Sequence, residues 1–280
     1  MKQLVARRGA SAYAPEHTLA SYKLAIRQGA DYVEQDLAVT RDHALICLHD
    51  DSLERTTNAA AVFPDRGVTD PQTGEKRWMA IDFTLAEIKQ LDAGSWFDPT
   101  FAGERVPTWE EAIATVGAAA GLYPELKTPA LYRARSIDQT ALFVESVARL
   151  RLDSRAPGSI VVQSFDDRTL RDVARQLPQL PRVLLIEPED GDRWLSREGL
   201  AEIASFATGI APSKQLLDGR PEIVKQAHAA GLTVTAWTFT TRAYENAAPR
   251  FTNVTEEMRY FLFELDVDAL FTDNPDRFPR

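Results

Sequence analysis

The chain has 280 residues, of which 44% are hydrophobic and 26% charged, and its formal net charge is −9. This composition excludes wholesale disorder, and the negative charge argues against a nucleic-acid partner, which normally needs a basic face. The single cysteine, Cys47, excludes an intramolecular disulfide and a cysteine-rich metal site. Because no run of 18 apolar residues occurs, we expect no integral membrane contact.

The first residues of the chain bear on the cellular compartment in which the protein is expected. Residues 1–8 read Met-Lys-Gln-Leu-Val-Ala-Arg-Arg and lack the apolar core of a signal peptide. We therefore expect a cytoplasmic protein, or a periplasmic or secreted one if a signal had been removed. Association into a homo-oligomer stays open at this stage.

Short runs of strand-forming residues alternate with segments of helical periodicity along the chain. The predicted strands are residues 3–6, 32–37, 121–126, 159–164, 182–186, 209–212, 232–238 and 269–272, and the main predicted helices are 16–28, 109–116, 137–150, 167–176 and 221–230. Eight strands alternating with helices predict a single-domain TIM (β/α)8 barrel over residues 1–280. A doubly wound open sheet is the rival, and the lack of a glycine-rich dinucleotide fingerprint after the first strand disfavours it.

One segment interrupts this alternation. Residues 39–48 contain two β-prone runs around a short polar turn, which is too short for a parallel crossover and therefore predicts a hairpin. The turn centre near Asp42 places Asp36 roughly opposite His49. Residues 50–106, with one helix at 84–91, then predict an insertion over the barrel mouth, between the second strand and the second helix.

Acidic side chains gather at the predicted carboxyl ends of the strands, where barrels carry their functional sites. Glu34 and Asp36 lie on one face of the second strand, and Glu125 lies near the end of the third. Three converging carboxylates repel one another, and a single hard divalent cation such as Mg²⁺ or Ca²⁺ relieves this repulsion. The alternative is that each carboxylate pairs separately with Arg8 or Lys127, but the joint placement of the three favours a metal site.

Cationic side chains and a histidine complete this predicted site. Arg8 and Lys127 beside a metal would cradle a phosphate, by bidentate hydrogen bonding and as a point charge respectively. His49, at the end of the hairpin, is a candidate general acid or base. Cys47 is expected to be a buried apolar residue, and the acidic run 187–192 lacks the spacing of a calcium loop and is expected to be solvated.

An ordered set of short motifs resembles the glycerophosphodiester phosphodiesterase family. The set begins with Ala-Arg-Arg-Gly-Ala-Ser at 6–11 and Pro-Glu-His-Thr at 15–18, and continues through Gly-Ala-Asp-Tyr-Val-Glu-Gln-Asp-Leu at 29–37, His-Asp at 49–50 and Arg-Thr-Thr at 55–57. Later members are Val-Pro-Thr at 106–108, Glu-Leu-Lys at 125–127, Ser-Phe at 164–165, Ala-Trp-Thr at 236–238 and Leu-Phe-Thr-Asp-Asn-Pro at 270–275. Each motif is weak alone, but together they cover residues 4–276 in order.

The resemblance implies metal-dependent hydrolysis of a glycerophosphodiester to a glycerol phosphate and an alcohol. It implies that Glu34, Asp36 and Glu125 hold the divalent cation, and that Arg8 and Lys127 bind the substrate phosphate. His49 matches one of the family's two catalytic histidines, the one that protonates the departing alcohol. Trp237 is expected either to face the alcohol portion in the substrate pocket or to pack in the barrel.

One position departs from the family pattern. The other catalytic histidine normally precedes the Arg-Gly pair directly, and here that position is Arg7. Arginine stays protonated and cannot serve as a base as a neutral imidazole can. His17, expected in the first turn of the first helix, is the nearest other histidine.

Two alternative functions follow from this departure and from the fold. A protein with the same site but little or no turnover would use Arg7 as an additional anion clamp. A related barrel phospholipase would need an apolar membrane-facing rim, and residues 50–106 are mostly polar, with Trp78, Trp96 and Phe97 the main exceptions.

Overall fold

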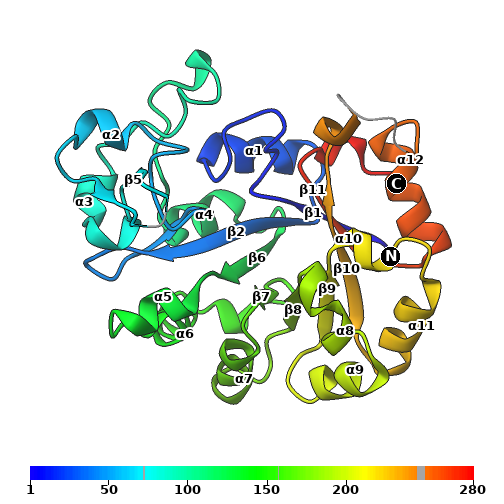
Figure 1. The fold of residues 1–280 in the computed structure, drawn as a ribbon. Coiled ribbons are helices and arrows are strands. Elements are labelled where there is room, and N and C mark those ends of the chain that lie inside the picture. Colours follow the sequence, from blue (N-terminus) through cyan, green and yellow to red (C-terminus); the bar gives the residue numbers. More distant parts are fainter. Residues whose placement is uncertain (72, 157, 245–249) are drawn as a thin grey trace.

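The structure, a computed structural model, describes residues 1–71, 73–156, 158–244 and 250–280. Eight parallel strands form its central sheet (Figure 1): β1 Gln3–Ala6, β2 Tyr32–Val39, β6 Gly121–Leu126, β7 Val162–Ser164, β8 Arg182–Ile186, β9 Gly209–Pro212, β10 Thr233–Phe239 and β11 Ala269–Thr272. Each strand pairs with the next, and β1 pairs with both β2 and β11. The sheet therefore closes into a TIM barrel, which confirms the predicted fold and excludes the open sheet.

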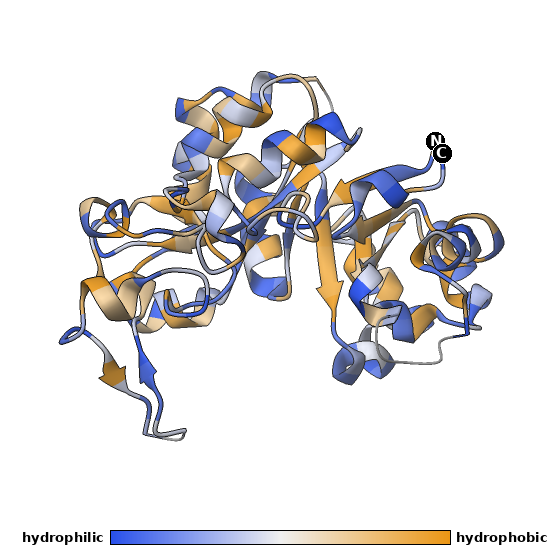
Figure 2. Cartoon of the chain, turned by 90° about the horizontal axis from the view of Figure 1, so that it is seen from above, coloured by the Kyte–Doolittle hydropathy of each residue, from blue (hydrophilic) through white to orange (hydrophobic). Residues whose placement is uncertain are grey.

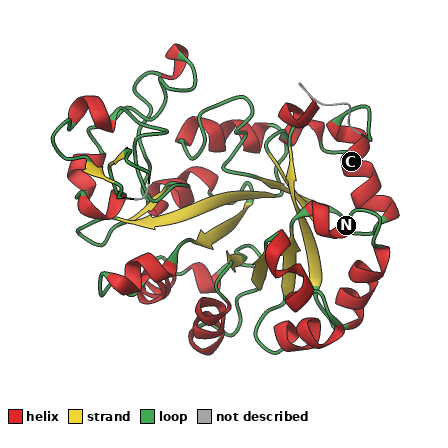
Figure 3. Cartoon of the chain, in the orientation of Figure 1, coloured by secondary structure: helices red, strands yellow, loops and turns green. Residues whose placement is uncertain are grey.

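Helices surround this barrel (Figure 3). The longer ones are α1 Leu19–Arg27, α4 Trp109–Val116, α6 Gln139–Arg149, α7 Asp167–Gln176, α9 Arg197–Ala204 and α11 Pro221–Ala229. Shorter ones are α2 Ala59–Val62, α3 Leu85–Ile88, α5 Pro129–Ala134, α8 Gly191–Trp194, α10 Lys214–Leu217 and α12 Val254–Arg259. Within the described ranges, no helix is both long and apolar enough to cross a membrane.

Apolar side chains fill both faces of the barrel wall. Some of the barrel strands are hydrophobic along much of their length (Figure 2). The interior cluster comprises Val5, Tyr123, Val161, Val183, Leu185, Ala211, Ala269 and Phe271. Two larger clusters pack the outer strand faces against the helices. This burial on both faces explains why strands such as β8 and β11 are apolar runs rather than alternating patterns.

The first helix begins later than predicted. Thr18 caps α1 by accepting a hydrogen bond from the Ser21 amide, and helical structure starts at Leu19 rather than at Glu16. His17 is therefore not in the first turn of the helix. It precedes the cap with a left-handed backbone (φ 56°), and its side chain is buried.

The predicted hairpin is present, with one correction to its register. β3, Leu45–Cys47, runs antiparallel to β2, with Leu37 opposite Cys47. Asp36 consequently lies opposite Leu48, whose amide donates to the Asp36 carbonyl (2.9 Å), and His49 is one residue further along. Cys47 is buried, as predicted. His43 is exposed at the hairpin tip.

The segment 50–106 lies beyond the carboxyl end of β2, where α2, α3 and β5 are grouped in Figure 1. It packs around an apolar cluster that includes Leu53, Trp78, Phe83 and Leu91 and that also takes in Ala38, Ile46 and Leu48 of the hairpin. The strand pair β4 Val68–Thr69 and β5 Lys76–Arg77 projects from the body of the molecule (Figure 2). The segment is also tied to the barrel loops, because Arg55 forms an ion pair with Glu16.

Candidate active site

A cavity of about 420 Å³ opens at the carboxyl ends of the barrel strands. All eight site residues predicted from the sequence line it: Arg7, Arg8, Glu34, Asp36, His49, Glu125, Lys127 and Trp237. The remaining lining residues are Phe165, Leu185, Glu187, Thr238 and Phe271. The barrel therefore gathers into one cavity side chains that are more than 200 residues apart in sequence.

The three carboxylates form one buried cluster. Asp36 on β2 is the register partner of Glu125 on β6, and Glu34 lies two residues earlier on the same strand face. One carboxylate oxygen from each residue lies within 4.8 Å of the others, and each residue is at most 5% exposed. A buried oxygen-only cluster with this spacing fits a divalent metal site.

The Glu34 carboxylate is held by neutral donors. One oxygen accepts the Arg8 amide (2.8 Å) and the other accepts the side-chain amide of Gln163 (3.1 Å), which is fully buried. Burial raises the pKa of Glu34, and the neighbouring Asp36 charge raises it further. Burial likewise raises the pKa of Glu125, against the opposing effect of Lys127. A cation in the cluster would stabilise the charged forms of both carboxylates.

Asp36 presents one free oxygen to this cluster. Burial disfavours its charge, but Lys127 and His17 outweigh that cost and hold the pKa of Asp36 well below its usual value. His17 Nε2 donates to Asp36 Oδ2 (2.7 Å), while His17 Nδ1 accepts from the Tyr22 hydroxyl (2.9 Å). Asp36 Oδ1 is buried and has no hydrogen-bond partner in the structure. Such an oriented carboxylate with one unused oxygen is what a metal ligand requires.

The turn after β1 positions Arg8. Arg8 and Gly9 both have left-handed backbones (φ 56° and 88°), and a Cβ at Gly9 would lie 2.3 Å from the Ser21 hydroxyl. The Arg8 guanidinium pairs with Glu16 (3.0 Å) and lies 3.4 Å from Asp36. Lys127, after β6, lies 3.4 Å from Glu125. Both cations thus border the carboxylate cluster.

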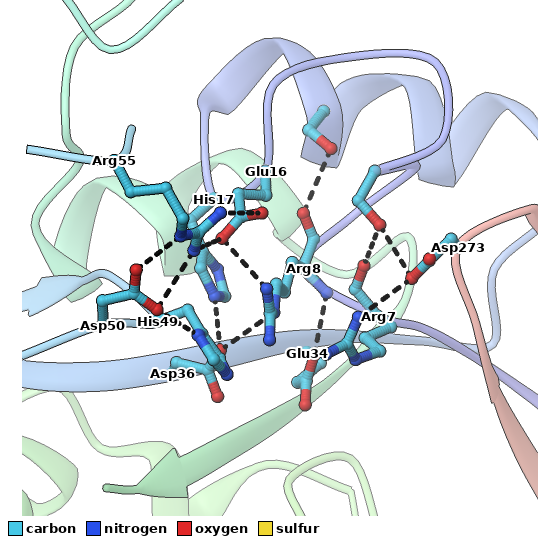
Figure 4. A network of polar contacts seen from close by, with 12 residues as sticks. Arg7, Arg8, Glu16, His17, Glu34, Asp36, His49, Asp50, Arg55 and Asp273 are labelled. Carbon is cyan, nitrogen blue, oxygen red and sulfur yellow. Dashed lines mark hydrogen bonds and ion pairs between the residues drawn. The ribbon is translucent and has the colours of Figure 1, made fainter. Parts of the chain in front are cut away.

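His49 belongs to a chain of ion pairs that reaches the same arginine (Figure 4). His49 Nδ1 lies 2.6 Å from Asp50 Oδ1, and Arg55 bridges Asp50 to Glu16, which in turn binds Arg8. The pKa of Asp50 is lowered because hydrogen bonds from His49 and Arg55 outweigh its burial. Asp50 is therefore an acceptor, Nδ1 carries a proton, and Nε2 is the nitrogen available to a ligand.

Arg7 lines the cavity on the side of β11. Its guanidinium is 3.3 Å from Asp273, and the Ser11 hydroxyl lies 3.1 Å from the same carboxylate oxygen. Burial opposes the charge on Arg7, but Asp273, Glu34 and Asp36 outweigh this effect and raise its pKa. Arg7 is a fixed cation here and not a proton acceptor.

The charged side chains share the cavity with an aromatic pair. Trp237, on β10, donates its indole N–H to the Ala211 carbonyl (2.7 Å), and its ring meets that of Phe165 edge to face at a centroid distance of 6.0 Å. Trp237 is therefore both packed in the barrel and open to the cavity, so the two expectations for it are not exclusive.

Comparison with known proteins agrees with this geometry. The sequence profile described as "Glycerophosphoryl diester phosphodiesterase family" matches residues 8–277. The chain belongs to the glycerophosphodiester phosphodiesterase family. It is 33% identical to the glycerophosphodiester phosphodiesterase of Bacillus subtilis, over 99% of this chain and 85% of that protein. It is 30% identical to the one from Caldanaerobacter subterraneus, over 99% and 96% respectively.

Solved structures of the family share the fold. A glycerophosphodiester phosphodiesterase from Agrobacterium tumefaciens superposes with a TM-score of 0.73 at 26% identity, covering 99% of both chains. A phosphodiesterase from Oleispira antarctica, solved with the product sn-glycerol-3-phosphate, superposes with a TM-score of 0.75 at 26% identity, covering 98% of this chain and 94% of that one.

Several residues of the site were not predicted from the sequence. Asp50, Arg55 and Glu16 form the network behind His49, and Asp273 pairs with Arg7. Each lies in a motif that resembles the family, and this was the available signal. Glu187 is exposed in the loop after β8, as expected, and it also borders the cavity, while the acidic run continues into a short helix, α8.

Proposed function

We propose that this chain hydrolyses glycerophosphodiesters to a glycerol phosphate and an alcohol in a metal-dependent reaction. The observation that carries the proposal is the shared cavity, in which three buried carboxylates face Arg8, Lys127 and His49. Family membership supports the same reaction class. The partner is thus a small-molecule diester.

Glu34, Asp36 and Glu125 would hold one divalent cation, Mg²⁺ or Ca²⁺, because oxygen-only ligands suit these hard ions. When bound, the cation supplies positive charge that polarises a phosphoryl oxygen. His17 contributes by fixing the rotamer of Asp36 through a buried hydrogen bond, so that Oδ1 stays directed at the cluster.

Arg8 and Lys127 would bind the phosphate. Both are nearly buried, and both already border carboxylates, so that their positions are set before a substrate arrives. Donors fixed in this way stabilise negative charge as it builds on the phosphoryl oxygens during attack. Glu16 and Arg55 hold Arg8 in place from behind.

His49 would act as the general acid. In the reaction a water oxygen forms a bond to phosphorus, the bond between phosphorus and the alcohol oxygen breaks, and protonated His49 donates its Nε2 proton to that oxygen. Asp50 accepts from Nδ1 and stabilises the charged ring. Burial nevertheless lowers the pKa of His49, so the acid form is favoured on the acidic side of neutrality.

Arg7 occupies the place where the family pattern has its second catalytic histidine. As a fixed cation, it would bind a phosphoryl oxygen but would not take the proton from the attacking water. We therefore propose a slow hydrolase, in which solvent accepts this proton.

The flanks of the cavity have proposed roles as well. The segment 50–106 supplies Arg55 to the network behind His49. We propose that the segment also forms the part of the cavity mouth above β2. Trp237 would form one wall of the substrate pocket and contact the alcohol portion.

A second function, diester binding with little or no turnover, is favoured by one observation. Among the described residues that line the cavity, His49 is the one histidine. His17 lies behind Asp36 and is bonded to Asp36 and Tyr22. In that case Arg7, Arg8 and Lys127 act together as an anion clamp.

Two measurements on the native protein separate these functions. Calorimetry records glycerophosphocholine binding in the presence of Mg²⁺ or Ca²⁺, and a choline-release assay records turnover. Binding with metal-dependent choline release supports the hydrolase, and binding without release supports the second function. Absence of binding, together with absence of release after Arg7→His, would overturn both.

A further inference from the structure

Two side chains approach the same carboxylate oxygen of Asp36 (Figure 4). His17 Nε2 lies 2.7 Å from Asp36 Oδ2, and Arg8 Nε lies 3.4 Å from it. The other oxygen, Oδ1, is buried and has no hydrogen-bond partner among the described residues. The His17 ring therefore helps to decide which oxygen of Asp36 is left for the carboxylate cluster.

The backbone holds His17 beside Arg8 but does not fix the imidazole ring. The His17 amide donates to the Arg8 carbonyl (3.0 Å), and the His17 backbone is left-handed, which is uncommon for a residue other than glycine. These constraints place the Cβ atom, whereas the terminal torsion of a histidine side chain is broad and leaves the ring free to turn. A ring turned over would present a carbon to Asp36 in place of Nε2. A second contact on the ring is needed to hold it.

Tyr22, on α1, supplies this second contact. Its hydroxyl lies 2.9 Å from His17 Nδ1, and the two rings meet edge to face at a centroid distance of 6.2 Å. Tyr22 is fully buried. Burial raises the pKa of Tyr22, and the neighbouring Cys47 raises it further, so the hydroxyl keeps its proton. Because ionised Asp36 can only accept, Nε2 carries the ring proton, and Nδ1 accepts from Tyr22.

We propose that Tyr22 is a positioning residue for the metal ligand Asp36 and that it acts through the orientation of the His17 ring. With a hydrogen bond at each nitrogen, the ring cannot turn over without losing both bonds. The inference rests on the proposed metal site, because it assumes that Asp36 holds the cation through Oδ1. Partners that orient a metal ligand change metal affinity without touching the ion.

Calorimetry on the full chain, with Mg²⁺ and separately with Ca²⁺, compares the Kd of the native protein, Tyr22→Phe and Tyr132→Phe. Tyr132 is the matched control, because it is a similarly buried tyrosine whose hydroxyl accepts the Val39 amide (3.1 Å) and does not contact His17 or the carboxylate cluster. We expect Tyr22→Phe to weaken metal binding roughly threefold to tenfold and Tyr132→Phe to leave it within roughly twofold.

The variant His17→Gln separates positioning of the ring from a general loss of packing. The glutamine amide can donate to Asp36 without an imidazole ring to orient, so this variant should keep most of the native affinity. Tyr22→Phe should then cause no further loss in the His17→Gln background. A further loss as large as that in the native background would mean that Tyr22 acts through packing, and it would overturn the proposal.

Nuclear magnetic resonance of the metal-free chain, with isotope-labelled histidine, observes the ring itself. The His17 signals, identified by their absence in His17→Gln, should show a proton on Nε2 and a bare Nδ1 that accepts a hydrogen bond. The Nδ1 signal should shift in Tyr22→Phe and stay in place in Tyr132→Phe. A native ring that carries a proton on Nδ1 would contradict the proposal.

The calorimetric outcomes distinguish this proposal from the metal site on which it rests. If the native chain binds the ion and Tyr22→Phe binds it equally well, the role of Tyr22 is overturned and the metal site stands. If the native chain binds neither Mg²⁺ nor Ca²⁺, the metal site is overturned, and the role of Tyr22 with it.

Discussion

Replacing Arg7 by histidine should convert a slow enzyme into a fast one. The native side chain is a cation held 3.3 Å from Asp273, and Asp273, Glu34 and Asp36 raise its pKa above the ordinary arginine value. It cannot accept a proton from the attacking water at any pH at which the protein is folded. A histidine at the same point on the cavity wall would supply that acceptor.

The expected gain in rate follows from the contribution that a positioned general base makes to catalysis. General acid–base catalysis contributes about 10²- to 10⁴-fold, so Arg7→His should raise kcat for glycerophosphocholine by at least roughly a hundredfold near pH 7. The rate should rise with pH through an added limb at about pH 6 to 7, where a histidine becomes neutral. Loss of one phosphate contact offsets part of the gain in kcat/KM, so kcat is the better reporter.

A choline-release assay between pH 5 and 9 measures this effect, with Arg7→Gln as the matched control. The glutamine removes the charge without supplying a base, and it should leave kcat low. If Arg7→His and Arg7→Gln raise kcat equally, the native arginine acts by its charge and the argument for a missing base is wrong. If the native chain is already fast and Arg7→His changes nothing, the base lies elsewhere in the cavity.

The network behind His49 yields two further predictions. Asp50→Asn removes the carboxylate that stabilises protonated His49, so the pKa of His49 should fall further. As a result kcat/KM at pH 7 should drop by roughly tenfold and recover at lower pH. A loss of kcat/KM that is independent of pH would count against the role assigned to Asp50. Arg55 and Arg8 lower the pKa of the largely buried Glu16 from 4.5 to about 2, despite the opposing effect of burial. Because the folded-state pKa is depressed, the associated stability of about 3 kcal/mol is complete above about pH 4.5 and is lost as the pH falls toward 2. In urea unfolding, Glu16→Gln should therefore have a lower free energy of unfolding than the native chain at pH 7, and this difference should shrink at pH 3. An equal difference at both pH values would refute this assignment.

The barrel strands were predictable because they are short runs of strand-forming residues that alternate with segments of helical periodicity. β8 and β11, buried on both faces, match the predicted bounds at both ends. The order of the strands also predicted that Glu34, Asp36 and Glu125 lie at one rim of the barrel. The four-residue helices α2 and α10 are too short to show helical periodicity and were not predicted.

Other features depend on contacts that sequence spacing does not reveal. The start of α1 was predicted too early because Glu16 and His17 precede the helix in a turn, in which His17 has a left-handed backbone, and their side chains reach Arg8 and Asp36. Glu187 is a solvated acid, as expected, but only closure of the sheet places it across the cavity from β1. The same closure brings Asp273 to Arg7, 266 residues away in sequence.

Calorimetric titration of Mg²⁺ or Ca²⁺ into the protein tests the central claim most directly, because the proposed reaction depends on the carboxylate cluster binding a cation. The native chain should bind one equivalent, and Glu34→Gln, Asp36→Asn and Glu125→Gln should each weaken binding by roughly tenfold or more. Asp273→Asn, which alters a buried carboxylate outside the cluster, should retain the native affinity. Unchanged affinity in all three cluster variants would contradict the account.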